Sequence, residues 1–221
     1  MTTRRGRRIY YVAATSRTGS SWLCNMLASS GVAGFPREYG WHMLDPYQLT
    51  ERWNRYADDD PFGSKVTYGE LASLWGREMS IEDCRNCRIV WMRRHHRVAQ
   101  AISLYRANES NCWHISAGEA SPESIRNVPF DRAKIIERLN QIQCHDALLD
   151  HWLAHHEQPV MQVWYEDLVD NPEGVTRNVL EFLGFDSRVP FIVDHYERMA
   201  GETTHEWIEM IGNPTAPDTV R

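Results

Sequence analysis

The sequence predicts an α/β fold of three layers, in which a central parallel β-sheet is flanked by helices. Short runs rich in β-branched and aromatic residues alternate along the chain with longer segments of helical period. The run Ile9–Ala14 passes through a small polar turn into a helical pattern over Ser21–Ser29. A second strand, Cys87–Met92, ends in a charged loop that leads into a helical face over Arg97–Asn108. The same succession of strand, short loop and helix therefore occurs twice.

The remaining elements continue this alternation. The sequence predicts a short strand or extended loop over Phe62–Val66, a long helix over Phe130–Glu157, a strand over Val160–Trp164, and a helix over Pro172–Leu183 that Gly184 ends. Weaker helical patterns cover residues 45–56 and 69–75. The segment Tyr196–Trp207 has no strong period and is a candidate to close over a ligand.

One soluble domain fits the length and composition. The 221 residues, 42% of them hydrophobic and 24% charged, suffice for one α/β domain over residues 1–221 and are few for two. A net charge of −6 argues against a general nucleic-acid binder, so the basic residues 1–8 are interpreted as a flexible tail. No apolar stretch approaches a membrane span, and the first apolar run is too short for a secretion signal. We therefore expect a cytoplasmic protein.

Cysteines and histidines raise the question of a metal site. Five cysteines, an odd number, favour free thiols in a reducing compartment. The possible ligands are Cys84 and Cys87 with Cys112 and His114, and separately His151, His155 and His156 on the long helix. The first group does not have the regular ligand spacing of a zinc site. In the second group two histidines could share a metal, but no third ligand is evident. Small loop residues and a solvated polar face are the preferred interpretations, so we expect no metal.

The turn after the first strand, residues 16–21, has the composition of a phosphate-binding loop. Backbone N–H groups and the positive end of a helix dipole meet at such a junction. The loop's side chains add a fixed charge from Arg17 and hydroxyl donors from Thr18, Ser20 and Ser21. A nucleotide-hydrolysing P-loop has Lys where Ser20 follows Gly19. The loop therefore suits one phosphate without a metal-bridged triphosphate; the alternative is a plain turn and helix cap.

A second phosphate site is expected where the second strand ends. Arg94 follows that strand, and Ser103 lies further along the next helix. Ligands of open α/β sheets bind at the carboxyl ends of the strands, where both loops fall. The alternative interpretation makes Arg94 an ordinary cation near a helix end and Ser103 a small packing residue.

Two further side chains are candidates for chemistry at this edge. Glu38 ends the turn-rich segment Gly31–Glu38, which returns toward the phosphate loop, and it is a candidate proton acceptor. His42 is a second possible acceptor, because its ordinary pKa lies nearer neutrality. Lys65 follows Gly63 in an apolar setting. The alternative for Glu38 and Lys65 is the solvent-exposed place that such residues usually take.

Taken together, these segments resemble the PAPS-dependent sulfotransferases, specifically the bacterial family that includes the trehalose sulfotransferases. The likeness rests on loop 16–21, on Gly31–Glu38, which is similar to the family's Gly-Val-Ala-Gly-x-Pro-x-Glu segment, on Ser64-Lys65, on Arg94 with residues 100–107 and Trp113, and on Tyr165, Leu180–Gly184 and Glu206-Trp207. It is patchy but runs the whole length of the chain.

The resemblance implies a P-loop-like sulfotransferase fold and a role for each candidate residue. It implies that PAPS (3′-phosphoadenosine 5′-phosphosulfate) is the sulfuryl donor and PAP the product, with no metal required. The implied 5′-phosphosulfate loop is Arg17, Thr18, Gly19, Ser20 and Ser21, and the 3′-phosphate residues are Arg94 and Ser103. Glu38 is implied as general base, and Lys65 as the cation at the bridging oxygen. The acceptor is a small hydroxyl compound, a carbohydrate or glycoconjugate, and a homodimer is in keeping with the family.

Departures from the family pattern concern the acceptor. The chain is shorter than the trehalose enzymes between Trp41 and Phe62, where an acceptor is expected, and His95-His96 replaces a Pro-Asp pair. A phenol or another non-sugar alcohol therefore stays open as acceptor. Two other classes are also open: a P-loop-like small-molecule kinase, which needs a Mg²⁺-ATP site, and a non-catalytic nucleotide-binding protein, which is indifferent to Glu38.

Overall fold

A four-stranded parallel sheet forms the centre of the described structure. The structure is a computed structural model, and it describes residues 8–38, 61–67, 87–114, 123–155, 157–193, 202–213 and 219–220. Within these ranges the sheet has the order β2-β1-β3-β5. Its strands are β1 (Ile9–Ala14), β2 (Phe62–Val66), β3 (Arg88–Arg93) and β5 (Val160–Trp164). The central strand β1 places Tyr10 beside Gly63 of β2 and Arg88 of β3.

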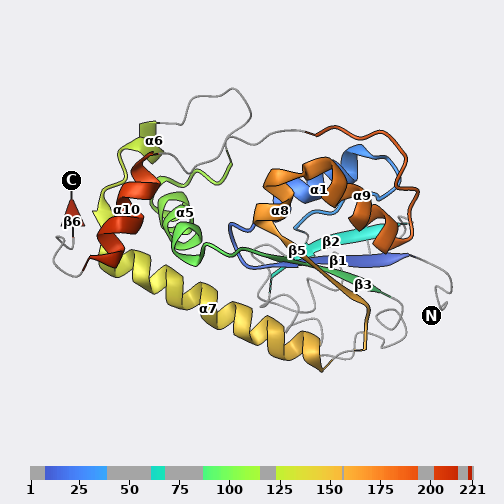
Figure 1. Ribbon diagram of the computed structural model, residues 1–221, viewed down its shortest axis with the longest axis horizontal. Coiled ribbons are helices and arrows are strands. Elements are labelled where there is room, and N and C mark those ends of the chain that lie inside the picture. Colours follow the sequence, from blue (N-terminus) through green and yellow to red (C-terminus); the bar gives the residue numbers. More distant parts are fainter. Residues whose placement is uncertain are drawn as a thin grey trace.

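Helices cover both faces of this sheet. The described helices are α1 (Ser20–Ser29), α5 (Arg97–Ser110), α6 (Glu123–Arg126), α7 (Arg132–Ala154), α8 (Tyr165–Asp170), α9 (Pro172–Leu183) and α10 (Glu202–Gly212). Figure 1 shows α1, α8 and α9 on one face and the long α7 along the other, with α5, α6 and α10 beyond the carboxyl ends of the strands. A short antiparallel pair joins β4 (Phe130–Asp131) to β6 (Thr219–Val220). The expected three-layer α/β fold is confirmed.

The strand side chains explain why both faces are covered. In β1 the alternate residues Tyr10, Val12 and Ala14 pack in one apolar cluster with residues of α1 and α9. Tyr11 and Ala13 point the other way, into a cluster with residues of α7. Successive side chains of a strand lie on opposite faces, so a strand that is apolar at every position needs a helical layer on each side.

A third apolar cluster joins α5, α7 and α10 beside the sheet. Trp207 of α10 is 7% exposed, and its ring meets Phe130 edge-on at 5.5 Å between centroids. Tyr105 of α5 lies against the same indole at 6.1 Å. This packing holds α5 in place, and the first turn of α5 lies close to the end of β3.

Most predicted elements are confirmed, with three corrections. The segment Phe62–Val66 is a strand, and the long helix begins at Arg132 because Phe130 and Asp131 pair with β6 and Asp131 accepts a hydrogen bond from the amide of Lys134. The short α8 was not predicted. Of the segment Tyr196–Trp207, expected to lack a regular period, residues 202–207 belong to α10 and the residues before them lie outside the described ranges. The helical patterns at 45–56 and 69–75 lie outside the described residues. Among the helices that are described, none is long and apolar enough to cross a membrane.

Candidate active site

The loop between β1 and α1 lies at the carboxyl end of the central strand. Two of its residues have left-handed backbone conformations, Arg17 at φ 68° and Gly19 at φ 77°. Gly19 is the N-cap of α1, and because it has no side chain it forms no side-chain cap hydrogen bond there. The backbone N–H groups of the first turn thus have no side-chain cap to satisfy them. An uncapped helix N-terminus of this kind favours an anion.

Gly19 is required here for two reasons. Its positive φ disfavours residues with a side chain, and an added Cβ would lie 2.8 Å from Cδ2 of the Tyr165 ring. Tyr165, the first residue of α8, therefore packs directly against the loop. The contact between Tyr165 and Gly19 thus brings the residue after β5 against the loop that follows β1.

We expect Gly19→Ala to destabilise the protein and to disturb the loop. Backbone strain and the clash with Tyr165 together cost about 1–3 kcal/mol, measurable by urea unfolding. Gly31→Ala is the matched control, because Gly31 also has a positive φ, 71°, but an added Cβ there meets nothing within 4 Å. Equal losses in the two variants would mean that the contact with Tyr165 does not matter.

Two arginines from different strand ends meet behind this loop. The Arg17 side chain donates from Nε to Ser103 Oγ at 2.9 Å and from Nη1 to the carbonyl of Trp113. Arg94 donates from Nη1 to the carbonyl oxygen of Arg17 at 3.2 Å, and its guanidinium lies 4.4 Å from the centre of the Tyr165 ring. Burial, and then the charge of Arg94, lower the pKa of Arg17 to about 10 against smaller opposing effects. Two adjacent, largely buried cations are a suitable environment for a phosphate dianion.

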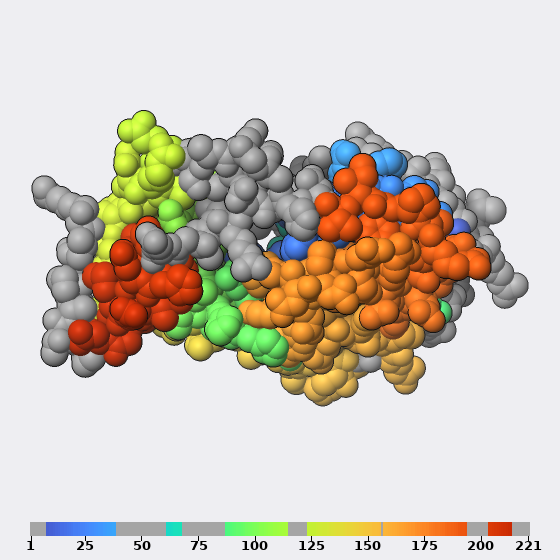
Figure 2. Space-filling view, turned by 45° about the horizontal axis from the view of Figure 1, so that its top comes forward, coloured from blue at the N-terminus to red at the C-terminus, as the bar shows by residue number. Residues whose placement is uncertain are grey.

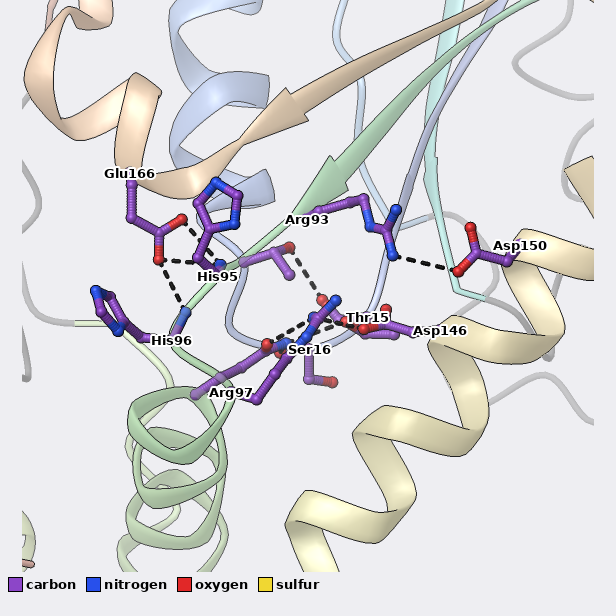
Figure 3. Close-up of polar contacts among 11 residues, drawn as sticks. Thr15, Ser16, Arg93, His95, His96, Arg97, Asp146, Asp150 and Glu166 are labelled. Carbon is purple, nitrogen blue, oxygen red and sulfur yellow. Dashed lines mark hydrogen bonds and ion pairs between the residues drawn. The ribbon is translucent and has the colours of Figure 1, made fainter. Parts of the chain in front are cut away.

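Residues of α5 and α7 support the loop from the protein interior. Gln100 donates from Nε2 to Thr15 Oγ1 at 3.0 Å and to the carbonyl of Ser16 at 2.8 Å. Arg97 forms an ion pair with the buried Asp146 of α7 (Figure 3). Burial raises the pKa of Asp146, although Arg97 and Thr15 act in the opposite direction. The sequence pattern singled out neither Gln100 nor Asp146 as residues of the site.

Glu38 and Lys65 form an ion pair at the same edge of the sheet. A parallel bridge pairs Arg37 with Ser64, and the amide of Lys65 donates to the carbonyl of Arg37 at 2.9 Å. The next side chains along the two segments, Glu38 and Lys65, therefore meet. Lys65 Nζ also donates to Ser21 Oγ in the first turn of α1 at 2.9 Å. One ammonium group thus connects a carboxylate to the phosphate loop.

A search of protein families identifies the chain. The model described as Stf0 sulphotransferase matches residues 9–79 and 67–211, which is most of the sequence. The chain belongs to the Stf0 sulphotransferase family. Its reaction is therefore the transfer of a sulfuryl group. The resemblance to the trehalose sulfotransferases is confirmed by two curated relatives, both named trehalose 2-sulfotransferase.

Two curated relatives match this sulfotransferase over nearly its full length. A trehalose 2-sulfotransferase of Mycobacterium tuberculosis is 20% identical, with 93% of this chain and 94% of the relative covered. A trehalose 2-sulfotransferase of Mycolicibacterium smegmatis is 23% identical, with coverages of 90% and 92%.

Solved sulfotransferase structures share the fold. One from Alicyclobacillus acidocaldarius has a TM-score of 0.52 at 14% identity and covers 94% of this chain and 92% of its own. A mouse sulfotransferase in complex with PAP has a TM-score of 0.53 at 13% identity, with coverages of 92% and 64%.

The residues singled out from the sequence come together in this sulfotransferase, with one regrouping. Arg17, expected beside the 5′-phosphosulfate, reaches Ser103, expected beside the 3′-phosphate. The Thr18 hydroxyl donates to the carbonyl of Thr15 at 3.0 Å and so serves the loop itself. Ser20 is buried, and Ser21 binds Lys65. In Figure 2, blue atoms from the first part of the chain show at the floor of a hollow beside the orange α8 and α9.

Some candidates lie elsewhere or outside the described residues. His42, Cys84 and His156 are not described. Among the described residues, no group of three His, Cys, Asp or Glu side chains is arranged to hold a metal, and the four described cysteines are free thiols. His114 was considered only as a metal ligand, yet burial, Arg17 and Lys65 lower its pKa while Glu38 raises it, so it lies within the field of the site.

Proposed function

We propose that this sulfotransferase transfers the sulfuryl group of PAPS to a hydroxyl of a carbohydrate, with Glu38 as general base. The observation that carries the proposal is the double contact of Lys65, which binds the Glu38 carboxylate on one side and Ser21 of the phosphate loop on the other. A proton acceptor, a cation and an anion-binding helix end thus share one place. Sulfuryl transfer to an alcohol needs these three groups together.

The residues of the site fit a nucleotide with two separate phosphate groups. The start of α1 with Ser20 and Ser21 suits the 5′-phosphosulfate, and Arg94 with Ser103 suits the 3′-phosphate. Arg17 links the two groups, since it belongs to the loop that leads into α1 while its carbonyl accepts from Arg94 and its guanidinium donates to Ser103. When bound, PAPS supplies an activated sulfuryl group whose bond to the 5′-phosphate breaks as the acceptor oxygen attacks the sulfur.

In the reaction, Glu38 accepts the proton of the acceptor hydroxyl. Lys65 stabilises the negative charge that develops on the departing 5′-phosphate, because a fixed cation in a partly buried site needs no reorganisation. Lys65 is only 14% exposed, so its charge is poorly screened by water. The ion pair with Lys65 also directs the Glu38 carboxylate toward the loop.

A carbohydrate is the proposed acceptor because both curated relatives are named trehalose 2-sulfotransferases. The kinase alternative is less favourable, since Ser20 stands where a P-loop has its phosphate-binding lysine and the family transfers sulfuryl groups.

The experiment that tests the donor and the acceptor combines titration with transfer. Calorimetry on the wild type should show tighter binding of PAP than of AMP, which lacks the 3′-phosphate, or of ATP with Mg²⁺. Incubation with ³⁵S-labelled PAPS should then label trehalose in preference to a phenol. Preference for Mg²⁺-ATP would refute the donor assignment, whereas labelling of the phenol alone would refute only the carbohydrate.

A further inference from the structure

Glu166 binds the backbone that precedes α5. It is the second residue of α8, just after β5, and its carboxylate faces the loop at the end of β3 (Figure 3). The amide of His95 donates to Oε2 at 3.0 Å and to Oε1 at 3.1 Å, and the amide of His96 donates to Oε1 at 3.2 Å. Both oxygens of one carboxylate are therefore used on two consecutive N–H groups.

This contact makes the two strand–loop–helix units of the sheet unlike each other. Neither Gly19, the N-cap of α1, nor His96, the N-cap of α5, forms a side-chain cap hydrogen bond, but Glu166 binds the two amides just before α5. Burial alone raises the pKa of Glu166, but the hydrogen bonds from backbone amides and the charge of Arg94 outweigh it and lower the pKa. Glu166 is thus ionised at neutral pH. The amides of His95 and His96 are therefore occupied and are not available to an incoming phosphate.

Arg94, the residue proposed to bind the second phosphate, projects from the turn that Glu166 holds. Arg94 precedes His95 directly, and its guanidinium lies over Tyr165, the neighbour of Glu166. The corner between β5 and α8 consequently contacts both the backbone that carries Arg94 and its guanidinium. Through its hydrogen bond to the Arg17 carbonyl, Arg94 also contacts the phosphate loop.

We propose that Glu166 is a positioning residue for the 3′-phosphate: its carboxylate fixes the turn at His95 and His96 and thereby the place of the Arg94 guanidinium. The inference rests on the proposed function, in which Arg94 binds that phosphate. It assigns Glu166 no contact with the ligand and no part in the proton transfer.

The experiment compares Glu166→Ala and Glu166→Gln with a matched control by calorimetric titration. PAP and AMP are the two probes, since they differ by the 3′-phosphate alone. Asp150→Asn is the control, because Asp150 binds the adjacent Arg93 at 3.2 Å from the other side of the strand end and is exposed (Figure 3). We expect Glu166→Ala to weaken the binding of PAP about tenfold and to change the affinity for AMP by no more than about twofold. Glu166→Gln should lose less affinity for PAP, since one oxygen remains to accept a hydrogen bond. The Asp150→Asn control should bind PAP as the wild type does.

A double variant separates positioning from general destabilisation. If Glu166 acts through Arg94, adding Glu166→Ala to Arg94→Ala should cost PAP no further affinity. Equal losses for PAP and AMP, or losses that add in the double variant, would overturn the inference. Where Glu166→Ala does not fold, the Glu166→Gln protein carries the same comparison. A wild type that does not prefer PAP to AMP would instead refute the proposed function, and the inference with it.

Discussion

The Glu38→Gln variant should lose about two to four powers of ten in kcat while its affinity for PAP is unchanged or raised. Glutamine keeps an oxygen that accepts from Lys65 Nζ, so the local geometry persists, but the amide takes up no proton from the acceptor. Removal of a negative charge beside Lys65 also leaves that cation more strongly available to the phosphosulfate. Initial rates of ³⁵S transfer and calorimetry with PAP measure the two quantities.

Glu173→Gln is a suitable control for this variant. Glu173 lies on α9, is 61% exposed, and pairs with Arg177 one helical turn away, so its replacement removes one carboxylate far from the loop. Its kcat should match the wild type. A Glu38→Gln enzyme within a few-fold of wild-type kcat would show that the base is another group, with His42 the first to replace.

Arg94→Ala should weaken the binding of PAP by about ten- to a hundredfold and the binding of AMP by no more than a few-fold. The estimate follows from about 1.5–3 kcal/mol for hydrogen bonds to a charged group. The small loss for AMP reflects the hydrogen bond from Arg94 to the Arg17 carbonyl, which steadies the phosphate loop. Calorimetric titration measures the loss of affinity for PAP and for AMP. Repeating it at a second salt concentration tests whether Arg94 binds a phosphate, because such a contact makes the affinity depend on salt.

Arg94→Lys distinguishes charge from geometry in the same titration. Lysine keeps the positive charge but lacks the planar fork that lies over Tyr165 and reaches the Arg17 carbonyl. We expect it to recover part of the PAP affinity. Identical losses for PAP and AMP in Arg94→Ala would contradict a role specific to the 3′-phosphate.

The sequence was sufficient for the central sheet and for helices α1, α5, α7 and α9, but insufficient for α8 and α10. Strand β1 is a continuous apolar run, β3 is apolar between its terminal arginines, and β5 is apolar apart from Gln162, so their positions could be predicted to within a residue or two. The six residues of α8 are too few for a helical period to be recognised. In α10, Trp207 and Thr204 are buried by α5 and its neighbours, which no local pattern specifies.

The composition of the site was predictable, but its connections were not. Gly19 and the hydroxyls around it form a local motif, and Arg94 follows an obvious strand. The contacts of Arg17 with Ser103 and of Glu166 with the amides of His95 and His96 join segments that are distant in sequence. Such contacts depend on strand order, and only the assembled sheet provides it.

The order of the strands also has a consequence for how the protein is made. Strand β1 lies between β2 and β3, and β3 pairs with β5, so Tyr10 meets Arg88 and Ile89 meets Val160. Contacts between such distant segments close large loops and are characteristic of slow folding. During synthesis the N-terminal β1 leaves the ribosome long before Tyr165 and Glu166 exist. Until then its apolar side chains lack their partners, and such transient exposure of apolar surface and unpaired strand edges favours aggregation.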